Sequence, residues 1–174
     1  MKLRKLKEKD AELMLEWMHD PFVVENLQND FHTKTIEDCR CFIMAAQDVS
    51  QNMHLAIVNS EDEYMGTVSL KNITKENAEF AITIRRSAMG QGYSKFGMNE
   101  IIEIGVEELG LEEIYWFVDP NNERAIKFYD KNGYRRVRLK DDLFFQNMKK
   151  NGQFTEEQLK KYIWYDVCVK EKQI

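Results

Sequence analysis

The segment that decides the fold is AEFAITIRRSAMGQGYS, which spans residues 78–94. The apolar pattern of Ala78–Ile84 predicts a β-strand, and apolar residues recur at helical spacing over Phe96–Leu109. The loop between them carries Gly90 and Gly92, and glycine lets a backbone approach a ligand closely. The first amides of a helix are unpaired donors at the positive end of its dipole. A strand, a glycine loop and a helix in this order therefore suit a phosphate or pyrophosphate.

Two other phosphate-binding loops fit this segment poorly. A P-loop requires G-x-x-x-x-G-K-S/T, and no Gly-Lys-Ser/Thr occurs here. A dinucleotide-binding fingerprint requires three spaced glycines early in a β-α-β unit, whereas this segment has two and follows a series of strands. For this segment taken alone, a glycine turn that only joins strand to helix remains an alternative.

Working outward, the chain predicts a helical first third, an antiparallel series of strands, and a strand–helix–strand crossover. The expected strands are Lys2–Leu6, Met53–Val58, Tyr64–Leu70, Ala78–Ile84, Ile114–Val118, Tyr134–Leu139 and Tyr162–Val169. The expected helices are one from an Asp10 cap to Met18, then Phe22–Leu27, Thr35–Gln47, Phe96–Leu109, Asn121–Lys131 and a short one capped by Thr155 and Gln158. Such an order predicts an α+β fold with a mixed sheet.

Length and composition indicate one globular domain over 1–174. The hydrophobic fraction of 43% and charged fraction of 32% are ordinary for a soluble protein. No run approaches the ~18 apolar residues that a membrane span requires. The start, Met1–Lys7, is basic but has no apolar segment typical of a secretory signal. We expect a cytoplasmic protein with no membrane partner.

Charge and residue spacing argue against two further classes of function. A net charge of -5 disfavours nucleic-acid binding, which requires a basic face. The three cysteines have no metal or redox spacing and suit a reducing compartment. His19, His32 and His54 share no ligand spacing, so we expect no metal.

Two motifs together resemble a known family. Met89–Ser94 resembles the Q/R-x-x-G-x-G/A loop of the GNAT acetyltransferases, with Gly92 at the central glycine, although Met89 and Ser94 depart from the pattern. Asn122–Tyr134 resembles that family's N-x-x-A-I-x-x-Y-x-x-x-G-F/Y block. The branch concerned contains ribosomal-protein N-terminal, spermidine and nucleotide-amino-sugar acetyltransferases.

The resemblance implies a GNAT fold, with a central mixed, mostly antiparallel twisted sheet of about seven strands flanked by helices. It implies an acetyl-CoA-dependent N-acetyltransferase that moves the acetyl group directly onto a primary amine. The cofactor would be held by the strand, the loop, Asn122 at the pantetheine arm and Lys127 at a phosphate. The expected cofactor contacts are Ile82, Ile84, Arg85, Met89, Gly90, Gln91, Gly92, Tyr93, Ser94, Asn122 and Lys127.

Two residues are candidates for catalysis. An alkyl ammonium has a pKa near about 10, so the acceptor must lose a proton before it attacks. The resemblance suggests Glu79 as a base working through water, with a strand-end ion pair as the alternative. It also suggests Tyr129 as the acid that protonates the thiolate, with a core tyrosine as the alternative.

The acceptor is left open by the sequence. The resemblance places the acceptor pocket at the front helices, which are the helices expected in the first third of the chain. The expected acceptor contacts are Trp17, Phe22, Asn26 and Phe31. The alternative is that these aromatic residues only fill the core. A protein N-terminus, a nucleotide-linked amino sugar and a polyamine all remain. The single acidic residue of 26–34, Asp30, counts against a polyamine. A catalytically silent GNAT-fold module that binds CoA or a partner is the alternative function. Oligomeric state, a homo-oligomer included, and the role of 141–161 also stay open.

Overall fold

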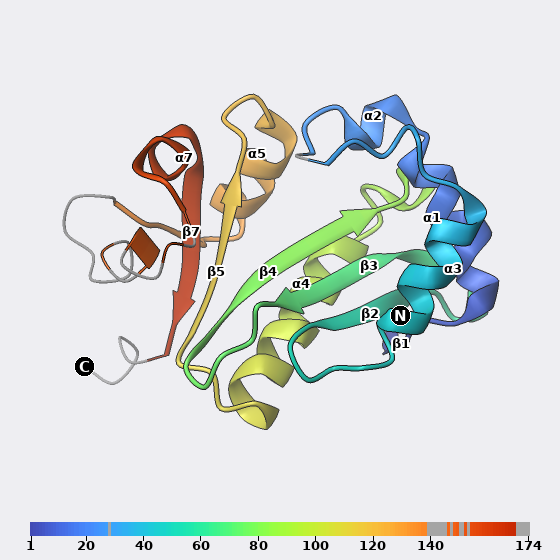
Figure 1. The fold of residues 1–174 in the computed structure, drawn as a ribbon, viewed down its shortest axis with the longest axis horizontal. Helices are drawn as coiled ribbons and strands as arrows, with labels where there is room; N and C mark the ends of the chain where they lie inside the picture. The colour runs from blue at the N-terminus through green and yellow to red at the C-terminus, as the bar shows by residue number, and fades with distance from the viewer. Residues whose placement is uncertain (28, 139–145, 147, 150–151, 153, 170–174) are drawn as a thin grey trace. The chain divides into compact units, whose positions relative to one another are not determined.

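The structure, a computed structural model, describes all residues except 28, 139–145, 147, 150–151, 153 and 170–174. The chain forms two compact units, Met1–Ile114 and Tyr115–Ile174 (Figure 1). The described residues contain the seven strands that the sequence predicts. The expectation of a single domain over 1–174 stays a prediction.

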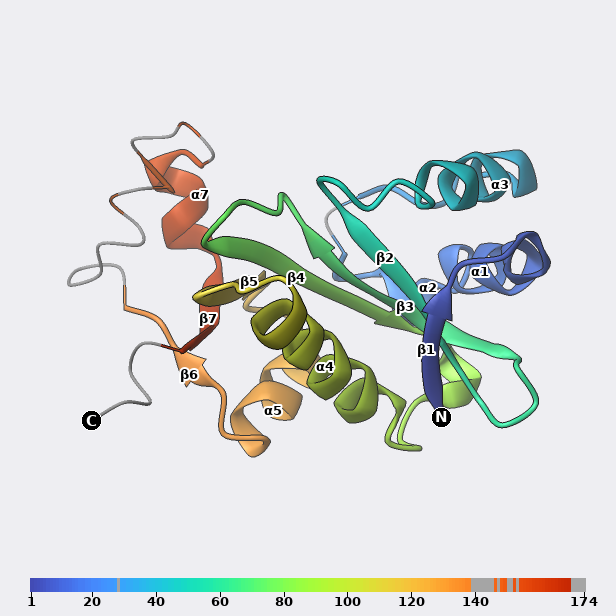
Figure 2. The same ribbon diagram turned by 90° about the horizontal axis from the view of Figure 1, so that it is seen from below.

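The first unit is built on four antiparallel strands in chain order. They are β1 (Lys2–Lys5), β2 (Met53–Val58), β3 (Tyr64–Lys71) and β4 (Asn77–Ile84). Each lies within one residue of the predicted bounds, because short, mostly apolar runs mark the strands and polar turns separate them. Figure 2 shows helices on both faces of this sheet, α1 and α3 on one and α4 on the other.

Side chains cap the start of two helices in the first third of the chain, α2 and α3. Thr35 and Asp38 form the predicted capping box at the start of α3 (Ile36–Ala45). The second helix, α2 (Pro21–Val24), starts earlier and ends earlier than expected, because Asp20 caps it with Pro21 in its first turn.

Asp10 does not have the predicted role of side-chain cap for α1 (Ala11–Met18). It ends a short 3₁₀ turn (Glu8–Asp10), and its carboxylate accepts the backbone N–H of Lys7 at 2.9 Å. The same carboxylate takes two hydrogen bonds from the Arg4 guanidinium, both 2.7 Å long. Asp10 is buried, so this bidentate pair ties β1 to the start of α1.

The helix after the glycine loop, α4 (Tyr93–Glu103), starts three residues before the predicted Phe96. A π-helical turn, Ile104–Glu108, continues it. Gly97 brings α4 close to the sheet: a Cβ atom there would lie 2.3 Å from Cδ1 of Ile57. The small side chain therefore sets the distance between helix and sheet.

The core of the first unit lies between the front helices and the sheet. It consists of buried apolar side chains from α1, α2, α3, β2 and the start of β3, among them Met14, Trp17, Val23, Cys39, Ile43, Ala56, Val58 and Tyr64.

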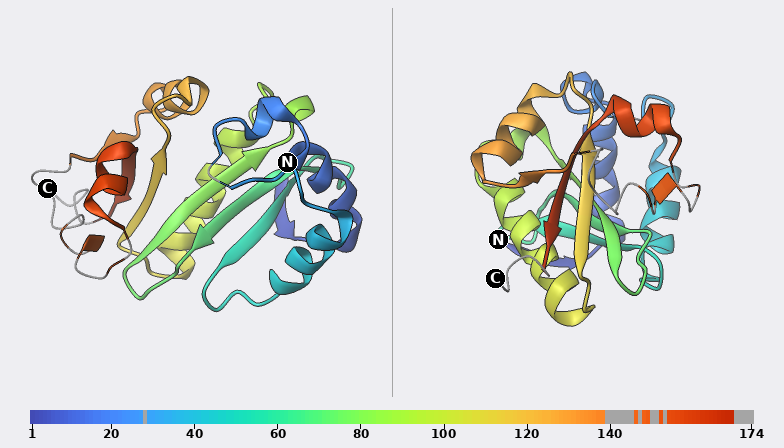
Figure 3. Two further views of the ribbon diagram at one scale, coloured as in Figure 1. Left: turned by 45° about the horizontal axis from the view of Figure 1, so that its top comes forward. Right: turned by 90° about the vertical axis from the view of Figure 1, so that its left-hand side faces the viewer.

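The second unit contains β5 (Glu113–Val118), α5 (Glu123–Lys131), β6 (Arg135–Arg136), α7 (Glu156–Lys161) and β7 (Ile163–Cys168). In this unit β7 lies between β5 and β6 (Figure 3). Gly133 has a φ of 77°, the left-handed conformation predicted just after α5. Thr155 and Gln158 form the predicted capping box of α7. The strand expected at Tyr134–Leu139 shortens to two residues, and Leu139 lies outside the described residues.

Within the described ranges, no helix combines the length and the apolar composition needed to cross a bilayer.

Replacing Asp10 with Asn should lower the free energy of unfolding by about 2 kcal/mol, because the largely buried Arg4 charge loses its buried carboxylate partner and keeps Asp62. Urea denaturation monitored by circular dichroism measures this. Asp48→Asn is the matched control, since Asp48 is exposed; it should change stability by less than about 0.5 kcal/mol. Equal midpoints for the two variants would show that the Arg4–Asp10 pair is not a main tie of β1.

Candidate functional site

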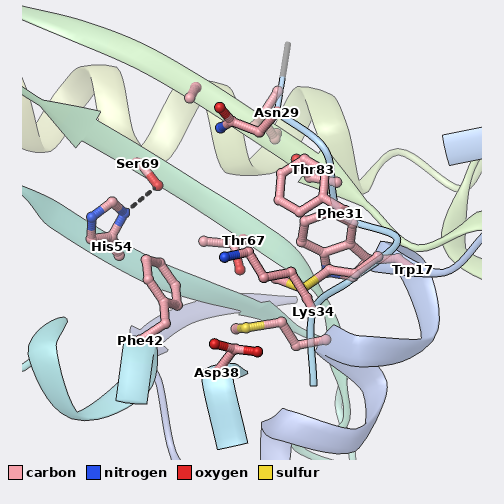
Figure 4. Close-up of a pocket in the computed structure, with 14 residues that line it drawn as sticks. Trp17, Asn29, Phe31, Lys34, Asp38, Phe42, His54, Thr67, Ser69 and Thr83 are labelled. Atoms are coloured by element: carbon pink, nitrogen blue, oxygen red, sulfur yellow. Dashed lines mark hydrogen bonds between the residues drawn. The ribbon is translucent and has the colours of Figure 1, made fainter. Parts of the chain in front are cut away.

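A cavity of about 350 Å³ lies in the first unit, between the sheet and the front helices (Figure 4). Residues of α1, α3, β2, β3, β4 and the loop before α3 line it. They are Met14, Trp17, Met18, Asn29, Phe31, Lys34, Asp38, Phe42, His54, Thr67, Ser69, Ala81, Ile82 and Thr83.

The floor of the cavity is a row of small and polar side chains on one face of the sheet. Strand register sets His54 opposite Ser69 and Ser69 opposite Ala81. Two residues along, Thr67 lies opposite Thr83. Because side chains alternate between faces, these positions share the face toward α1 and α3. The floor thus offers hydroxyl groups and one imidazole.

The walls are aromatic and are held by hydrogen bonds. Nε1 of Trp17 donates to the Tyr64 hydroxyl at 3.0 Å, and this hydroxyl lies 2.7 Å from Oγ1 of Thr67. The ring of Phe31 packs edge-on against Trp17, with 5.2 Å between centroids. The Trp17 wall is therefore fixed to the floor through a buried tyrosine.

The charges around the cavity nearly cancel. Lys34 and Asp38 are both exposed, and each contributes one formal charge to the lining. Hydrogen bonds from the Thr35 hydroxyl and backbone lower the pKa of Asp38, so this carboxylate is ionised at neutral pH. Burial, with a smaller effect of the Lys71 charge, lowers the pKa of His54 below its ordinary 6.5. At neutral pH the imidazole is therefore uncharged.

The glycine loop has the geometry that the sequence predicts for it. Gly90 and Gly92 have φ values of 76° and 89°, and Gly92 is the N-cap of α4. A glycine cap offers no side-chain acceptor, so the amides of the first turn, from Tyr93 and Ser94 onward, face outward without a capping oxygen. Gln91 closes the loop by donating to the Ser87 carbonyl at 2.7 Å. The first-turn amides are thus open to an anion.

Arg85, an expected cofactor contact, is engaged in hydrogen bonds within the first unit. Its buried guanidinium donates to both carboxylate oxygens of Glu16, at 3.1 and 2.9 Å. It also donates to Glu63 and to the Tyr64 carbonyl, both at 3.0 Å. A guanidinium engaged in this way holds the end of β4, and the cofactor role of Arg85 stays a prediction.

Glu79 lies near the start of β4, at the opposite end from the glycine loop. Its carboxylate is buried and pairs with Nζ of Lys71 at 2.5 Å and with Nδ2 of Asn72 at 3.2 Å. It is not one of the residues that line the cavity. The ion pair matches the alternative named for this residue, and the base role stays a prediction.

Tyr129 belongs to an aromatic cluster in the second unit. Its buried ring lies 5.2 Å, centroid to centroid, from the rings of Trp116 and Tyr165. Burial, with the nearby Tyr134 and Tyr165, raises the pKa of its hydroxyl. The phenol therefore keeps its proton at neutral pH, as a proton donor requires.

The other two expected cofactor contacts of this unit lie on α5. Asn122 caps the helix by accepting the backbone N–H of Ala125 at 3.1 Å. This bond uses the oxygen of the carboxamide, and the NH₂ group is not part of the cap. Lys127 is exposed and pairs with Glu123 at 2.7 Å. Both cofactor roles stay predictions.

Only part of the expected acceptor set meets at the cavity. Trp17 and Phe31 line it, together with the expected cofactor contact Ile82. Phe22 is exposed, stacks under Arg86 at 4.6 Å, and lies outside the lining, as does Asn26.

The polar floor of the cavity was not predicted from the sequence. The available signal was Thr67 and Ser69, two hydroxyl side chains at alternate positions of an otherwise apolar strand. His54 was considered only as a metal ligand. In the part of the chain that the structure describes, no three His, Cys, Asp or Glu side chains are grouped to hold a metal ion.

The comparisons with known proteins agree with one another. The family model described as acetyltransferase (GNAT) domain matches residues 1–135. Acetyltransferase PseH of Campylobacter jejuni strain 81-176 is 26% identical over 132 residues, which are 74% of this chain and 79% of that protein. Spermidine N(1)-acetyltransferase of Escherichia coli K12 is 28% identical over 127 residues, which are 72% of this chain and 62% of that enzyme.

Similarity also extends to solved structures. Spermidine N-acetyltransferase from Vibrio cholerae, in complex with CoA and spermine, superposes with a TM-score of 0.75 at 16% identity. The superposition covers 96% of this chain and 94% of that one, so the seven strands and their helices have the expected GNAT fold. The chain belongs to the acetyltransferase (GNAT) family, which confirms the enzyme class expected from its two motifs.

Proposed function

We propose that the protein transfers the acetyl group of acetyl-CoA to the primary amine of a small molecule that binds in the cavity. One observation carries this proposal: a single strand serves both places. Ile82 and Thr83 of β4 line the cavity, and β4 ends at Ile84, directly before the glycine loop. A coenzyme gripped by the loop would extend its arm along the strand that borders the acceptor.

Acetyl-CoA fits the residues of the first unit. The first-turn amides of α4 would hold the diphosphate, with Gly90 and Gly92 allowing the backbone to approach it. The amides of Ile82 and Ile84 would pair with the pantetheine arm as an added strand does. When bound, the coenzyme supplies an activated thioester. The similar Vibrio cholerae enzyme binds CoA, which supports this assignment.

The cavity favours an amine with one positive charge on an apolar body. Its walls carry Trp17, Phe31 and Phe42, and its one carboxylate, Asp38, is balanced by Lys34. A polyamine carries several ammonium groups, and each would need a carboxylate or solvent. The spermidine acetyltransferases among the relatives make a polyamine the second candidate, with Asp38 as its counter-charge.

In the proposed reaction the amine loses one proton and attacks the acetyl carbonyl. A C–N bond forms, the C–S bond breaks, and a strand amide near Ile84 would stabilise the developing oxyanion. The departing thiolate would need a proton, and the candidate donor is Tyr129, whose raised pKa keeps the phenol protonated. The second amine proton restores the phenol, and the products are an amide and CoA.

Gly92→Glu should abolish measurable binding of acetyl-CoA, because it strains a left-handed backbone and sets a carboxylate against the diphosphate. Titration calorimetry measures the affinity. Gly110→Glu is the matched control: Gly110 has a φ of 68° and open space around it, so it tests strain and charge away from the loop. Normal binding by Gly92→Glu would remove the loop from the cofactor site.

Tyr129→Phe should lower kcat by about 10²-fold at neutral pH and leave the affinity for acetyl-CoA nearly unchanged, because only the donated proton is lost. Steady-state kinetics and calorimetry separate the two effects. Tyr162→Phe, a change of the same kind at a half-buried tyrosine of the same unit, should leave kcat unchanged. Unchanged turnover of Tyr129→Phe would exclude the acid role.

A panel of amines tests the acceptor class by release of CoA thiol. We expect 2-phenylethylamine and similar apolar monoamines to be acetylated with a higher kcat/KM than spermidine. A preference for spermidine would instead support the polyamine candidate. Absence of turnover with every amine, despite binding of acetyl-CoA, would support the catalytically silent module.

A further inference from the structure

A serine and a histidine face each other inside the cavity. Nδ1 of His54 lies 2.7 Å from Oγ of Ser69, as the dashed line in Figure 4 shows. Both residues line the cavity, and Ser69 is otherwise buried. The His54 ring is held from the other side by Phe42, edge-on, with 4.9 Å between centroids. The pair is therefore rigid and in contact with the space that the acceptor occupies.

The strand register shows which member of the pair lies nearer to β4. His54 lies opposite Ser69, and Ser69 lies opposite Ala81. Neighbouring strands are about 4.8 Å apart, so the serine hydroxyl is one strand from β4 and the imidazole is two. Ser69 is thus the member of the pair nearer to the strand along which the thioester is proposed to lie.

Burial, with a smaller effect of the Lys71 charge, lowers the pKa of His54 and keeps its imidazole neutral at pH 7. Lys71 on β3 is the cation that lowers its pKa after burial, and Glu79 on β4 partly neutralises Lys71 in an ion pair. Lys34 and Asp38 belong to the same cavity lining and have opposite charges. A neutral imidazole has one nitrogen with a free lone pair, and this nitrogen can accept a proton.

We propose that Ser69 and His54 form a proton relay that deprotonates the acceptor amine. The ammonium gives one proton to Oγ of Ser69 while the serine hydroxyl proton passes to Nδ1 of His54. The amine becomes neutral, the serine is unchanged, and the imidazolium later returns its proton to solvent. Ser69 contacts the amine, and His54 takes up the proton behind it. The proposal rests on the acetyl transfer proposed above.

The relay provides a base within reach of the cavity, which Glu79 does not. The Glu79 carboxylate is buried, bonded to Lys71 and Asn72, and outside the cavity lining. A base is effective only within hydrogen-bond reach of the proton or through one water. Ser69 satisfies that condition for an amine in the cavity.

The pH dependence of kcat/KM for 2-phenylethylamine tests the relay. In the wild-type enzyme, activity should fall as pH decreases through the pKa of His54, because the protonated imidazole accepts no proton. This acidic limb should therefore lie below pH 6.5. His54→Gln and Ser69→Ala should each lower kcat/KM at pH 7 by about 10²-fold and lose this limb. The double variant should lose no more than either single variant, since each breaks the same relay.

A weaker amine provides a second readout. The compound 2,2-difluoro-2-phenylethylamine is a much weaker base, so less of it needs deprotonation. With this substrate, the loss of kcat/KM in His54→Gln relative to wild type should be smaller. A purely structural defect would lower kcat/KM for both substrates by the same factor. His32→Gln is the matched control, since His32 is exposed and outside the cavity lining; it should keep full activity and the acidic limb.

The outcomes are distinct. If wild-type protein acetylates no amine, the proposed function fails. If wild type is active and either relay variant keeps both its turnover and its acidic limb, the relay is overturned. Loss of the limb in Glu79→Gln alone would also overturn it. If the variants do not fold, NMR titration of His54 in the wild-type complex with CoA decides, and a pKa different from that of the kinetic limb rejects the relay.

Discussion

The buried guanidinium of Arg85 is the interaction on which the first unit depends. It follows the last residue of β4, and its four hydrogen bonds reach α1 through Glu16, the turn before β3 through Glu63, and β3 through the Tyr64 carbonyl. A planar donor with bonds in several directions fixes the chain where the strand ends and the glycine loop begins. The cavity wall on α1 and the loop are thus positioned by one side chain.

This arrangement separates two kinds of polar group. Arg85 and Asp10 are buried and fully engaged, and they connect elements. Ser69, Thr67 and His54 face a cavity and have bonding capacity toward it. Buried polar groups without partners are costly, so polar side chains facing an apolar-walled space indicate a ligand that completes their bonding. For the proposed function, that ligand is the amine that receives the acetyl group.

Much of the fold was predictable because its signals are local. The apolar runs of β2, β3 and β4, the Thr35–Asp38 capping box and the left-handed glycines each depend on a few neighbouring residues. The start of α2 was misplaced, because Asp20 and Pro21 begin a helix where the proline was read only as an interruption. The role of Asp10 was missed, since it depends on Arg4 in a strand that the local pattern does not connect to it.

The site was less predictable, for the same reason. Motif resemblance located the glycine loop and two cavity walls, Trp17 and Phe31. It also placed Arg85 among the cofactor contacts, a role that stays a prediction; the engagement of its guanidinium by Glu16 and Glu63, far away in sequence, was not foreseen. The floor of the cavity depends on the register of three strands, and no single segment reveals which hydroxyl lies beside which imidazole.

The bond between Trp17 and Tyr64 has a spectroscopic consequence. Trp17 is the only indole of residues 1–114, and it forms a wall of the cavity. Its environment combines a hydrogen bond to a buried phenol with edge contact to Phe31. Indole emission depends on local polarity, so the molecule carries an intrinsic fluorophore in the wall of the cavity that we propose for the acceptor. The fluorescence of Trp17 would report binding of a ligand in the cavity without an attached dye.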